Sequence, residues 1–341
     1  MVKKIRKTIE SANINFLIGS GLSRPFLEVL NDVEIFLSDS QKTSAEITAK
    51  KKEYFNKVMV GNLDIINDTS NMNKDDVLTN YKNFYKILNN ILLKRENSIL
   101  TKQVNIFTTN VDIFSEKALE DTGIEFNDGF HGRFRPVFSL SNFKKSYFKK
   151  SLHYENTSEI PVFNILKLHG SLTWKYNKAA NKIFLDCNLD CVKKVKADLS
   201  NADFDKSYKE LIIVNPNKEK FEDTLVKQYY YDLLRIYSNE LEKENCLLFV
   251  LGFSFADEHI RDLTARVADS NPTLKTYIFS HGTSTTIYDN LRDEAKNRNI
   301  EIIVPEVGKN YDLKTLNADI FEKIIAESED VVDPAIGITA P

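Results

Sequence analysis

The chain has 341 residues, 42% of them hydrophobic and 28% charged, which is the composition of a globular protein able to bury a full core. Its 46 lysines and arginines nearly balance 49 aspartates and glutamates, so the net charge of −3 provides no global basic field for nucleic acid. We therefore predict no direct nucleic-acid partner, although a local patch could still supply one. No apolar stretch approaches the roughly 18 residues of a membrane span. Three cysteines make no disulfide framework, and we expect a cytoplasmic protein.

Short apolar runs alternate with charged stretches of helical periodicity along most of the chain. Runs rich in Ile, Val and Phe are typical of strands buried on both faces of a parallel sheet. Their alternation with helices, such as one expected over Glu222–Glu242, favours a Rossmann-like, doubly wound α/β fold with a mostly parallel sheet. The predicted strands are Asn15–Ile18, Val104–Phe107, Asn164–Leu168, Leu211–Val214, Cys246–Leu251, Thr276–Phe279 and Ile300–Val304.

Three segments interrupt the alternation of strands and helices. Residues 27–100 are polar and helical in pattern, whereas residues 127–163 are aromatic-rich and residues 175–210 polar, both irregular. We interpret them as a helical insertion module and two irregular insertions at one edge of the sheet, all within one nucleotide-binding domain over residues 1–310. Residues 311–341 are predicted to form a C-terminal helix and a mobile tail. Within the first insertion, an amphipathic helix is expected around Tyr81, Phe84, Leu88, Ile91 and Leu92.

The first candidate motif follows the earliest predicted strand. Gly19, Ser20, Gly21 and Ser23 come directly after the apolar run that ends at Ile18. Glycines permit a tight turn and let a phosphate approach backbone N–H groups at the start of a helix. A plain strand-to-helix turn uses the same residues, so this motif leaves phosphate binding and simple turning open.

A second polar cluster ends the predicted strand Val104–Phe107. Thr108, Thr109, Asn110 and Asp112 stand where ligands of open parallel sheets bind, beyond the carboxyl end of a strand. Polar groups directly after a buried run are costly unless they find partners. Taken alone, the segment is better explained by helix capping, with Thr109 or Asn110 as the cap and Asp112 in the first turn.

Two further strand ends carry polar residues or glycine. His169 follows a buried run and precedes a glycine, where a neutral imidazole could act as a general base or could simply be hydrogen-bonded in a turn. Because His169 repeats the strand-end position of Asn110, we favour the catalytic reading. Gly252 and Ser254 end the most hydrophobic run, and either close approach of a ribose or adenine or a sharp turn explains the glycine. Four such ends at one sheet edge form a constellation that capping does not explain.

Residues 257–259, Asp-Glu-His, have the composition of a metal cluster but not its spacing. Adjacent side chains do not converge on one ion, so we predict that the two acids open a helix instead. Cys187 and Cys191 form a single CxxxC pair with no second pair to complete a zinc site. The sequence therefore predicts no metal.

In this order, the segments GSGLS, TTNVD, KLHGS and GFSFAD resemble the sirtuin family, and more closely the sirtuin-like domains of bacterial antiviral defence proteins. The resemblance spans residues 14–280 and extends to IVNPNKEK at Ile213–Lys220 and FNDGFHG at Phe126–Gly132. It implies a Rossmann-like domain that binds NAD in an extended pocket between the sheet edge and an inserted module.

The resemblance also implies roles for individual residues. Asn110 would contact the nicotinamide ribose and position the attacking water, Asp112 would lie near the carboxamide, and His169 would be the base. Gly252 and Ser254 would line the adenosine end. The pyrophosphate would be held by Gly19, Gly21 and Ser23, and the same cofactor site is expected to include Ser20, Thr108 and Thr109.

Two departures from the deacylase sirtuins bear on the reaction. The two CxxC pairs of their structural zinc are missing, and the acid–arginine stretch of their cofactor loop has no match after Ser23. These departures favour plain hydrolysis of NAD to nicotinamide and ADP-ribose, with water as acceptor and no metal. A protein deacylase or ADP-ribosyltransferase, which needs a peptide groove, and a non-catalytic NAD or ADP-ribose sensor are the alternatives.

A freely active NAD hydrolase would be toxic to its own cell, so the hypothesis includes regulation. We expect a homo-oligomer that depletes NAD in antiviral, abortive-infection defence under the control of a partner. Residues 281–341 are too few for a sizeable sensor domain. The resemblance therefore suggests a separate regulatory protein, either a hexameric translocase-type ATPase or a nucleotide-processing protein.

Overall fold

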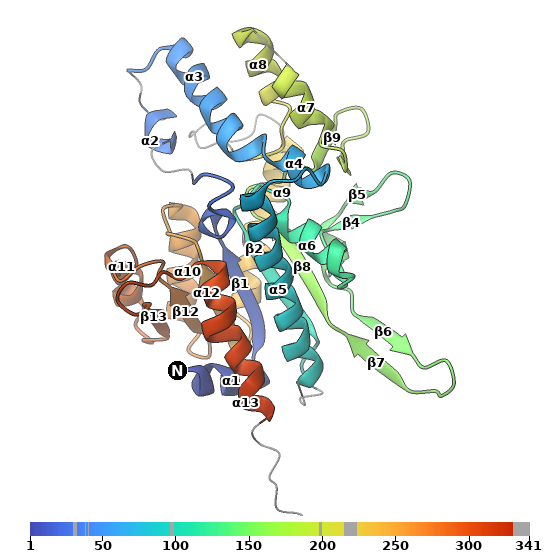
Figure 1. Ribbon diagram of the computed structural model, residues 1–341, viewed down its shortest axis with the longest axis vertical. Helices are drawn as coiled ribbons and strands as arrows, with labels where there is room; N and C mark the ends of the chain where they lie inside the picture. The colour runs from blue at the N-terminus through green and yellow to red at the C-terminus, as the bar shows by residue number, and fades with distance from the viewer. Residues whose placement is uncertain are drawn as a thin grey trace, which may run out of the picture.

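A seven-stranded sheet forms the centre of the computed structural model, which describes residues 1–29, 33–37, 39, 41–95, 99–197, 200–214 and 224–329 (Figure 1). The strand order is β13-β12-β11-β1-β2-β8-β3, and each neighbouring pair is parallel. The predicted Rossmann-like α/β fold is thus confirmed. The strands are β1 (Asn13–Ile18), β2 (Gln103–Thr108), β3 (Phe126–Asn127), β8 (Val162–Lys167), β11 (Cys246–Leu251), β12 (Lys275–Phe279) and β13 (Ile300–Ile303).

Helices cover both faces of this sheet. Strand β11 shows the division, because Leu247 and Phe249 belong to one hydrophobic cluster and Leu248 and Val250 to the other. Alternate residues of a strand point to opposite faces, so a strand covered on both faces is mostly apolar along its whole length. One face is covered by α1 (Val2–Ser11), α5 (Met72–Lys94), α6 (Phe114–Thr122), α12 (Leu313–Leu316) and α13 (Glu322–Glu329), and the other by α9 (Thr224–Leu241), α10 (Glu258–Ser270) and α11 (Thr286–Glu294).

Residues 27–100 are not one insertion, contrary to the sequence interpretation. Helix α5, the predicted amphipathic helix, is the crossover from β1 to β2 and packs on the sheet, with the Phe84 ring edge-on to Phe16 at 5.3 Å between centroids. The preceding segment lies beyond the sheet edge and meets α7 and α8 (Figure 1). We call these elements the helical cap: α2 (Val33–Leu37), α3 (Ser44–Tyr54), η2 (Phe55–Met59), α4 (Asn62–Ile66), α7 (Asp190–Ala197) and α8 (Asn201–Tyr208).

The two segments expected to be irregular contain short regular elements. Within 127–163 and 175–210, strands of two to four residues are too brief to show a period in sequence. Four of them make the antiparallel sheet β4-β5-β10-β9, and β6 pairs with β7 in a hairpin that projects from the body (Figure 1). They are β4 (Phe130–His131), β5 (Val137–Phe138), β6 (Tyr147–Lys150), β7 (Thr157–Ile160), β9 (Trp174–Asn177) and β10 (Lys182–Leu185), with η3 (Leu140–Phe143) between β5 and β6.

The predicted strand Leu211–Val214 is wrong. Only Ile213 pairs there, in a single antiparallel bridge to Gly170, and the segment instead supports the turn that follows β8. The predicted C-terminal helix corresponds to α12, η4 (Asn317–Phe321) and α13, whereas residues 330–341 of the tail expected from Ser328 lie outside the described residues. Among the helices described, none is long and apolar enough to cross a membrane.

Candidate functional site

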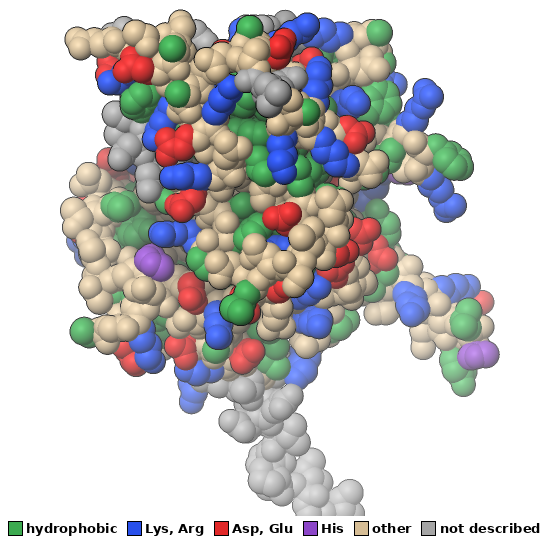
Figure 2. Space-filling view, turned by 45° about the horizontal axis from the view of Figure 1, so that its top comes forward, with side chains coloured by type: hydrophobic (Ala, Val, Ile, Leu, Met, Phe, Trp, Pro, Cys, Tyr) green, Lys and Arg blue, Asp and Glu red, His purple; other side chains and the backbone are tan. Residues whose placement is uncertain are grey.

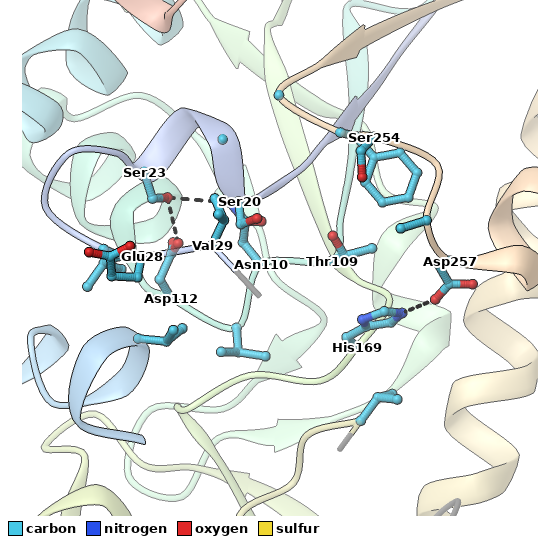
Figure 3. A pocket seen from close by; sticks show the side chains of 18 of the residues that line it. Ser20, Ser23, Glu28, Val29, Thr109, Asn110, Asp112, His169, Ser254 and Asp257 are labelled. Carbon is cyan, nitrogen blue, oxygen red and sulfur yellow. Dashed lines mark hydrogen bonds and ion pairs between the residues drawn. The ribbon is translucent and has the colours of Figure 1, made fainter. Parts of the chain in front are cut away.

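A pocket of about 360 Å³ opens where β1, β2, β8 and β11 end, between the sheet edge and the helical cap. That volume lies within the range of small-molecule sites. Figure 3 shows a Ser23–Asp112 pair on one side and a His169–Asp257 pair on the other, with Thr109 between them. The sequence-predicted residues that line it are Ser20, Gly21, Ser23, Thr109, Asn110, Asp112, His169, Gly252 and Ser254.

The glycines at the pocket rim serve close backbone packing. The N–H groups of Gly19 and Gly21 donate to the carbonyls of Leu251 and Gly252, both at 3.0 Å, so neither N–H is free for a phosphate. Gly252 has a φ of +60° and turns sharply beneath them. Of the two explanations that the sequence left open for each motif, turn geometry accounts for these glycines, and Gly19 itself lies behind the pocket wall.

Replacing Gly19 by alanine is expected to destabilise this wall. The added Cβ would stand 2.4 Å from the Gly252 oxygen and 2.7 Å from the Phe253 Cα, backbone atoms that cannot swing aside. Overpacking of this kind costs roughly 1–3 kcal/mol in the free energy of unfolding, measurable by urea titration. Gly282→Ala is the matched control, because its Cβ would meet nothing within 4 Å. Equal stability of the two variants would contradict the conclusion that Gly19 is needed for close backbone packing.

Hydrogen bonds hold the Asn110 side chain in place but leave its acceptor oxygen without a partner among the described residues. Its Nδ2 donates to the Gly19 oxygen at 3.1 Å and lies 3.4 Å from Ser23 Oγ, while its backbone N–H donates to Thr108 Oγ1 at 3.0 Å. The side chain is 6% exposed, and its Oδ1 is buried without a hydrogen-bond partner among the described residues. An unpaired buried acceptor is costly, so this oxygen is placed for a donor that a ligand or water brings.

Thr108 and Ser23 support Asn110 and Asp112. The Thr108 hydroxyl donates to the Ile18 oxygen at 3.0 Å, and the residue lies behind the residues that line the pocket. Ser23 is 1% exposed and donates to Asp112 Oδ2 at 2.7 Å. Its hydroxyl also lies 3.2 Å from Tyr81 Oη on α5. With its hydrogen committed to Asp112, Ser23 does not have the free donor that a pyrophosphate contact requires.

His169 faces a carboxylate that sequence reasoning had placed only as a helix start. Its Nε2 lies 2.9 Å from Asp257 Oδ2, an ion-pair distance without the alignment of a hydrogen bond. Asp257 also caps α10 as predicted, since its Oδ1 accepts from the Ile260 N–H at 3.1 Å. Burial alone would raise the pKa of Asp257, but contact with His169 outweighs it and lowers the pKa below its usual value.

The turn that carries His169 is fixed by the segment mispredicted as a strand. The His169 oxygen accepts from the Val214 N–H at 2.8 Å, and the Ser171 N–H donates to the Ile212 oxygen at 3.2 Å. Gly170 has a φ of +76°, and a Cβ there would lie 2.0 Å from the Ile212 oxygen. Glycine is therefore required directly after His169. The glycine that follows the histidine in the sequence was the signal for this turn.

A buried lysine, which the sequence analysis did not single out, anchors the Asn110 loop from behind. Lys167 ends β8, is 4% exposed, and donates to the backbone oxygens of Asp112, in a short contact, and of Asn110, at 3.3 Å. Its Nζ pairs with Glu116 Oε1 at 3.1 Å. Burial raises the pKa of Glu116 despite the lysine charge. A single lysine on an apolar strand beside His169 was the available signal, because a buried lysine needs partners.

The helical cap and the segment that leads into it supply residues that the sequence analysis did not assign to the site. Leu27, Glu28, Val29, Tyr54 and Val58 line the pocket opposite the strand ends. Tyr54 is 6% exposed, and burial together with the charge of Asp112 raises its pKa. None of these positions follows a strand, so the rule that led to the other site residues could not identify them.

No individual curated protein matches the chain. The model of a family described as SIR2-like domain matches residues 104–303, which is 200 of the 341 residues. The match contains the segments that carry Asn110, His169 and Asp257, and it begins after the Gly19 turn. With more than half of its length matched, the chain belongs to the SIR2-like domain family.

Proposed function

We propose that this protein hydrolyses NAD to nicotinamide and ADP-ribose. SIR2-like domains are generally NAD-dependent enzymes, which sets the substrate class. The observation that carries the proposal is that one pocket holds both an unpaired amide acceptor, Asn110 Oδ1, and an imidazole with a carboxylate partner, His169. An acceptor that fixes a hydroxyl or a water, and a base that takes its proton, are the groups hydrolysis needs.

The charge of the pocket suits a cationic reaction centre. Asp112, Asp257 and Glu28 line it, and among the described residues that line it there is no lysine or arginine. In NAD the nicotinamide ring is cationic, and positive charge passes to the ribose carbon as the glycosidic bond breaks. Nearby carboxylates stabilise such an oxocarbenium-like centre, as they do in glycoside hydrolysis. We assign this electrostatic role to Asp112, whose Oδ2 is oriented by Ser23.

The reaction balances without a further reactant. The bond between the ribose C1′ and the nicotinamide nitrogen breaks, and its electron pair neutralises the ring. Water forms the new C–O bond, and its proton passes to His169, whose charged form Asp257 then stabilises at 2.9 Å. Asn110 Oδ1 would accept a hydrogen bond from the ribose hydroxyl or from that water. This hydrogen bond would hold the water and the ribose C1′ in position for the attack.

Product analysis separates this proposal from its alternatives. Purified full-length protein is incubated with NAD, alone and with an acetyl-lysine peptide, and products are resolved by chromatography. If the protein is a hydrolase, it should release nicotinamide and free ADP-ribose in equal amounts, whether or not the peptide is present. Peptide-dependent turnover would instead identify a deacylase or ADP-ribosyltransferase, and binding of NAD without turnover a sensor.

We further propose that NAD cleavage serves antiviral, abortive-infection defence and is controlled by assembly. Unrestrained cleavage would exhaust the NAD of the cell that makes the protein, which is the physical reason to expect control. The proposed control is a homo-oligomer together with a separate regulatory protein, either a hexameric translocase-type ATPase or a nucleotide-processing protein. Native mass and NAD turnover of the protein, alone and co-expressed with candidate partners, test this. Full activity of a lone monomer would refute it.

The Asp257→Asn variant is expected to reduce kcat for NAD at least tenfold, because the carboxylate that orients and stabilises the imidazole is lost. The KM should change less, since Asp257 acts through His169. The cap on α10 survives, because asparagine also accepts from the Ile260 N–H. Asp262→Asn, on the same helix with a side chain 69% exposed, is the control and should retain full activity.

The stability that Asp257→Asn loses relative to the wild-type protein is expected to depend on pH. The pKa of Asp257 is lower in the folded chain than its ordinary 3.8, so its stabilising contribution is complete above that value. The contribution is lost as pH falls through the lowered folded-state pKa. The stability deficit of Asp257→Asn should therefore be full at neutral pH and shrink only below pH 3.8 in denaturant titrations. A deficit that persisted unchanged far below pH 3.8 would contradict the pairing.

A further inference from the structure

Two β structures project from the same side of the molecule (Figures 1 and 2). The first, here the loop arm, comprises β4, β5 and their connection over residues 130–138. The second, the hairpin arm, comprises β6, β7 and their connection over residues 144–160. Figure 2 shows Lys and Arg side chains beside hydrophobic ones on both projections. The proposed NAD reaction uses neither arm.

The arms are basic in a chain that is otherwise acidic. Residues 130–160 contain six lysines and arginines and two glutamates, a net charge of +4. The whole chain carries −3, so the remaining residues carry −3 − 4 = −7. Overall composition therefore conceals a local positive patch. Such a separation of charge within one chain favours a polyanionic partner for these arms.

The positive charges of the arms are not neutralised within the chain. Arg133 and Arg135 in the loop arm, and Lys149 and Lys150 in the hairpin arm, are exposed. In the part of the chain that the structure describes, none of the four has an ion-pair partner. By contrast, Lys4, Lys194 and Lys296 elsewhere on the surface each pair with a carboxylate within 3.0 Å. Four unpaired cations on two projecting arms are free to meet phosphates.

Aromatic rings stand beside these cations. Phe134 lies between the two arginines and is 99% exposed, and in the hairpin arm Phe148 is 62% and Tyr154 73% exposed. All four residues of β6 are exposed, and alternation places Tyr147 with Lys149 on one face and Phe148 with Lys150 on the other. Each face of the hairpin thus presents an aromatic ring and a cation two residues apart.

We propose that the two arms bind single-stranded nucleic acid. Lysine and arginine would neutralise phosphates, and the exposed rings would offer stacking surfaces to unpaired bases, the combination used for strands without sequence preference. An acidic protein would satisfy the cations, but it does not require a fully exposed ring between two arginines. In a duplex the base faces are already stacked, so the rings favour the single strand.

The test is fluorescence anisotropy of the full-length protein with a labelled 30-mer of oligo(dT), in 50 to 200 mM salt. With four phosphates neutralised, affinity should fall roughly 50-fold over this range, because log K changes by about 0.7 per phosphate for each tenfold change in salt. In Arg133→Ala/Arg135→Ala, the same change of salt should weaken binding only about sevenfold. Phe134→Ala and Phe148→Ala should each weaken binding roughly tenfold through lost stacking.

Controls make the result specific to the arms. Lys3→Ala/Lys314→Ala removes two exposed cations on α1 and α12 and should leave binding unchanged. A duplex of the same length should bind more weakly than the single strand. Absence of binding at 50 mM salt, or an equal loss in the control variant, would overturn the proposal. So would a lower native mass of Phe134→Ala or Phe148→Ala, which would identify the arms as a protein interface.

Discussion

Replacing Asn110 by alanine is expected to reduce NAD cleavage by 10²- to 10³-fold, on the order of the loss when one preorganised polar group is removed from a catalytic site. The variant deletes Oδ1, which has no hydrogen-bond partner among the described residues, from a side chain that Gly19 and Ser23 hold in place. Because that acceptor is proposed to bind the ribose hydroxyl or the attacking water, kcat should fall more than the affinity for NAD. Single-turnover kinetics and isothermal titration with NAD measure the two separately.

The control for this variant is Asn83→Ala, a replacement of the same residue type at an exposed position on α5. It should retain full activity, and both variants should unfold within about 1–2 kcal/mol of the wild-type protein, because Asn110→Ala loses at most one or two hydrogen bonds. Undiminished cleavage by a folded Asn110→Ala protein would refute the proposed role. Loss of folding would show instead that its contacts with the Gly19 turn are structural.

The second large effect is expected for Lys167→Met. This replacement keeps the length of the side chain but removes the cation that holds the backbone oxygens of Asn110 and Asp112 and pairs with Glu116. Breaking a buried pair by removing one partner costs about 3–5 kcal/mol, since the other charge stays buried without compensation. We expect a loss of that size in the free energy of unfolding from urea titration, together with loss of NAD cleavage.

A double variant separates stability from activity. In Lys167→Met/Glu116→Gln the unpaired charge is gone, so much of the stability should return, whereas cleavage should stay low because the Asn110 loop still lacks its anchor. The single variant should also be less destabilised at pH 5 than at pH 8. Burial already raises the pKa of Glu116, and proton uptake by the folded chain stabilises it at lower pH. Full recovery of activity in the double variant would show that Lys167 is not a positioning residue.

Six of the seven strands of the central sheet, and the strand ends that carry Asn110, His169 and Gly252, could be predicted from the sequence. A strand buried on both faces is a nearly continuous apolar run, and its end is marked where several polar residues follow one another. Parallel strands place those ends at one edge, so the site followed from local pattern and one rule of topology. Helix α5 was recognised by its periodicity, but its role as a crossover was not, because periodicity does not tell which surface a helix covers.

Only the tertiary structure decided which partners those residues have. Asp257 is 88 residues from His169 and had a sufficient local explanation as a helix cap, so nothing in sequence linked the two. Lys167 at the end of β8 pairs with Glu116 on α6, and Ser23 meets Asp112 from the end of a different strand. Local sequence determines where a polar group can stand, because burial and backbone preference act over a few residues. Pairing acts through space between distant segments, so the fold determined which of these groups belong to one site.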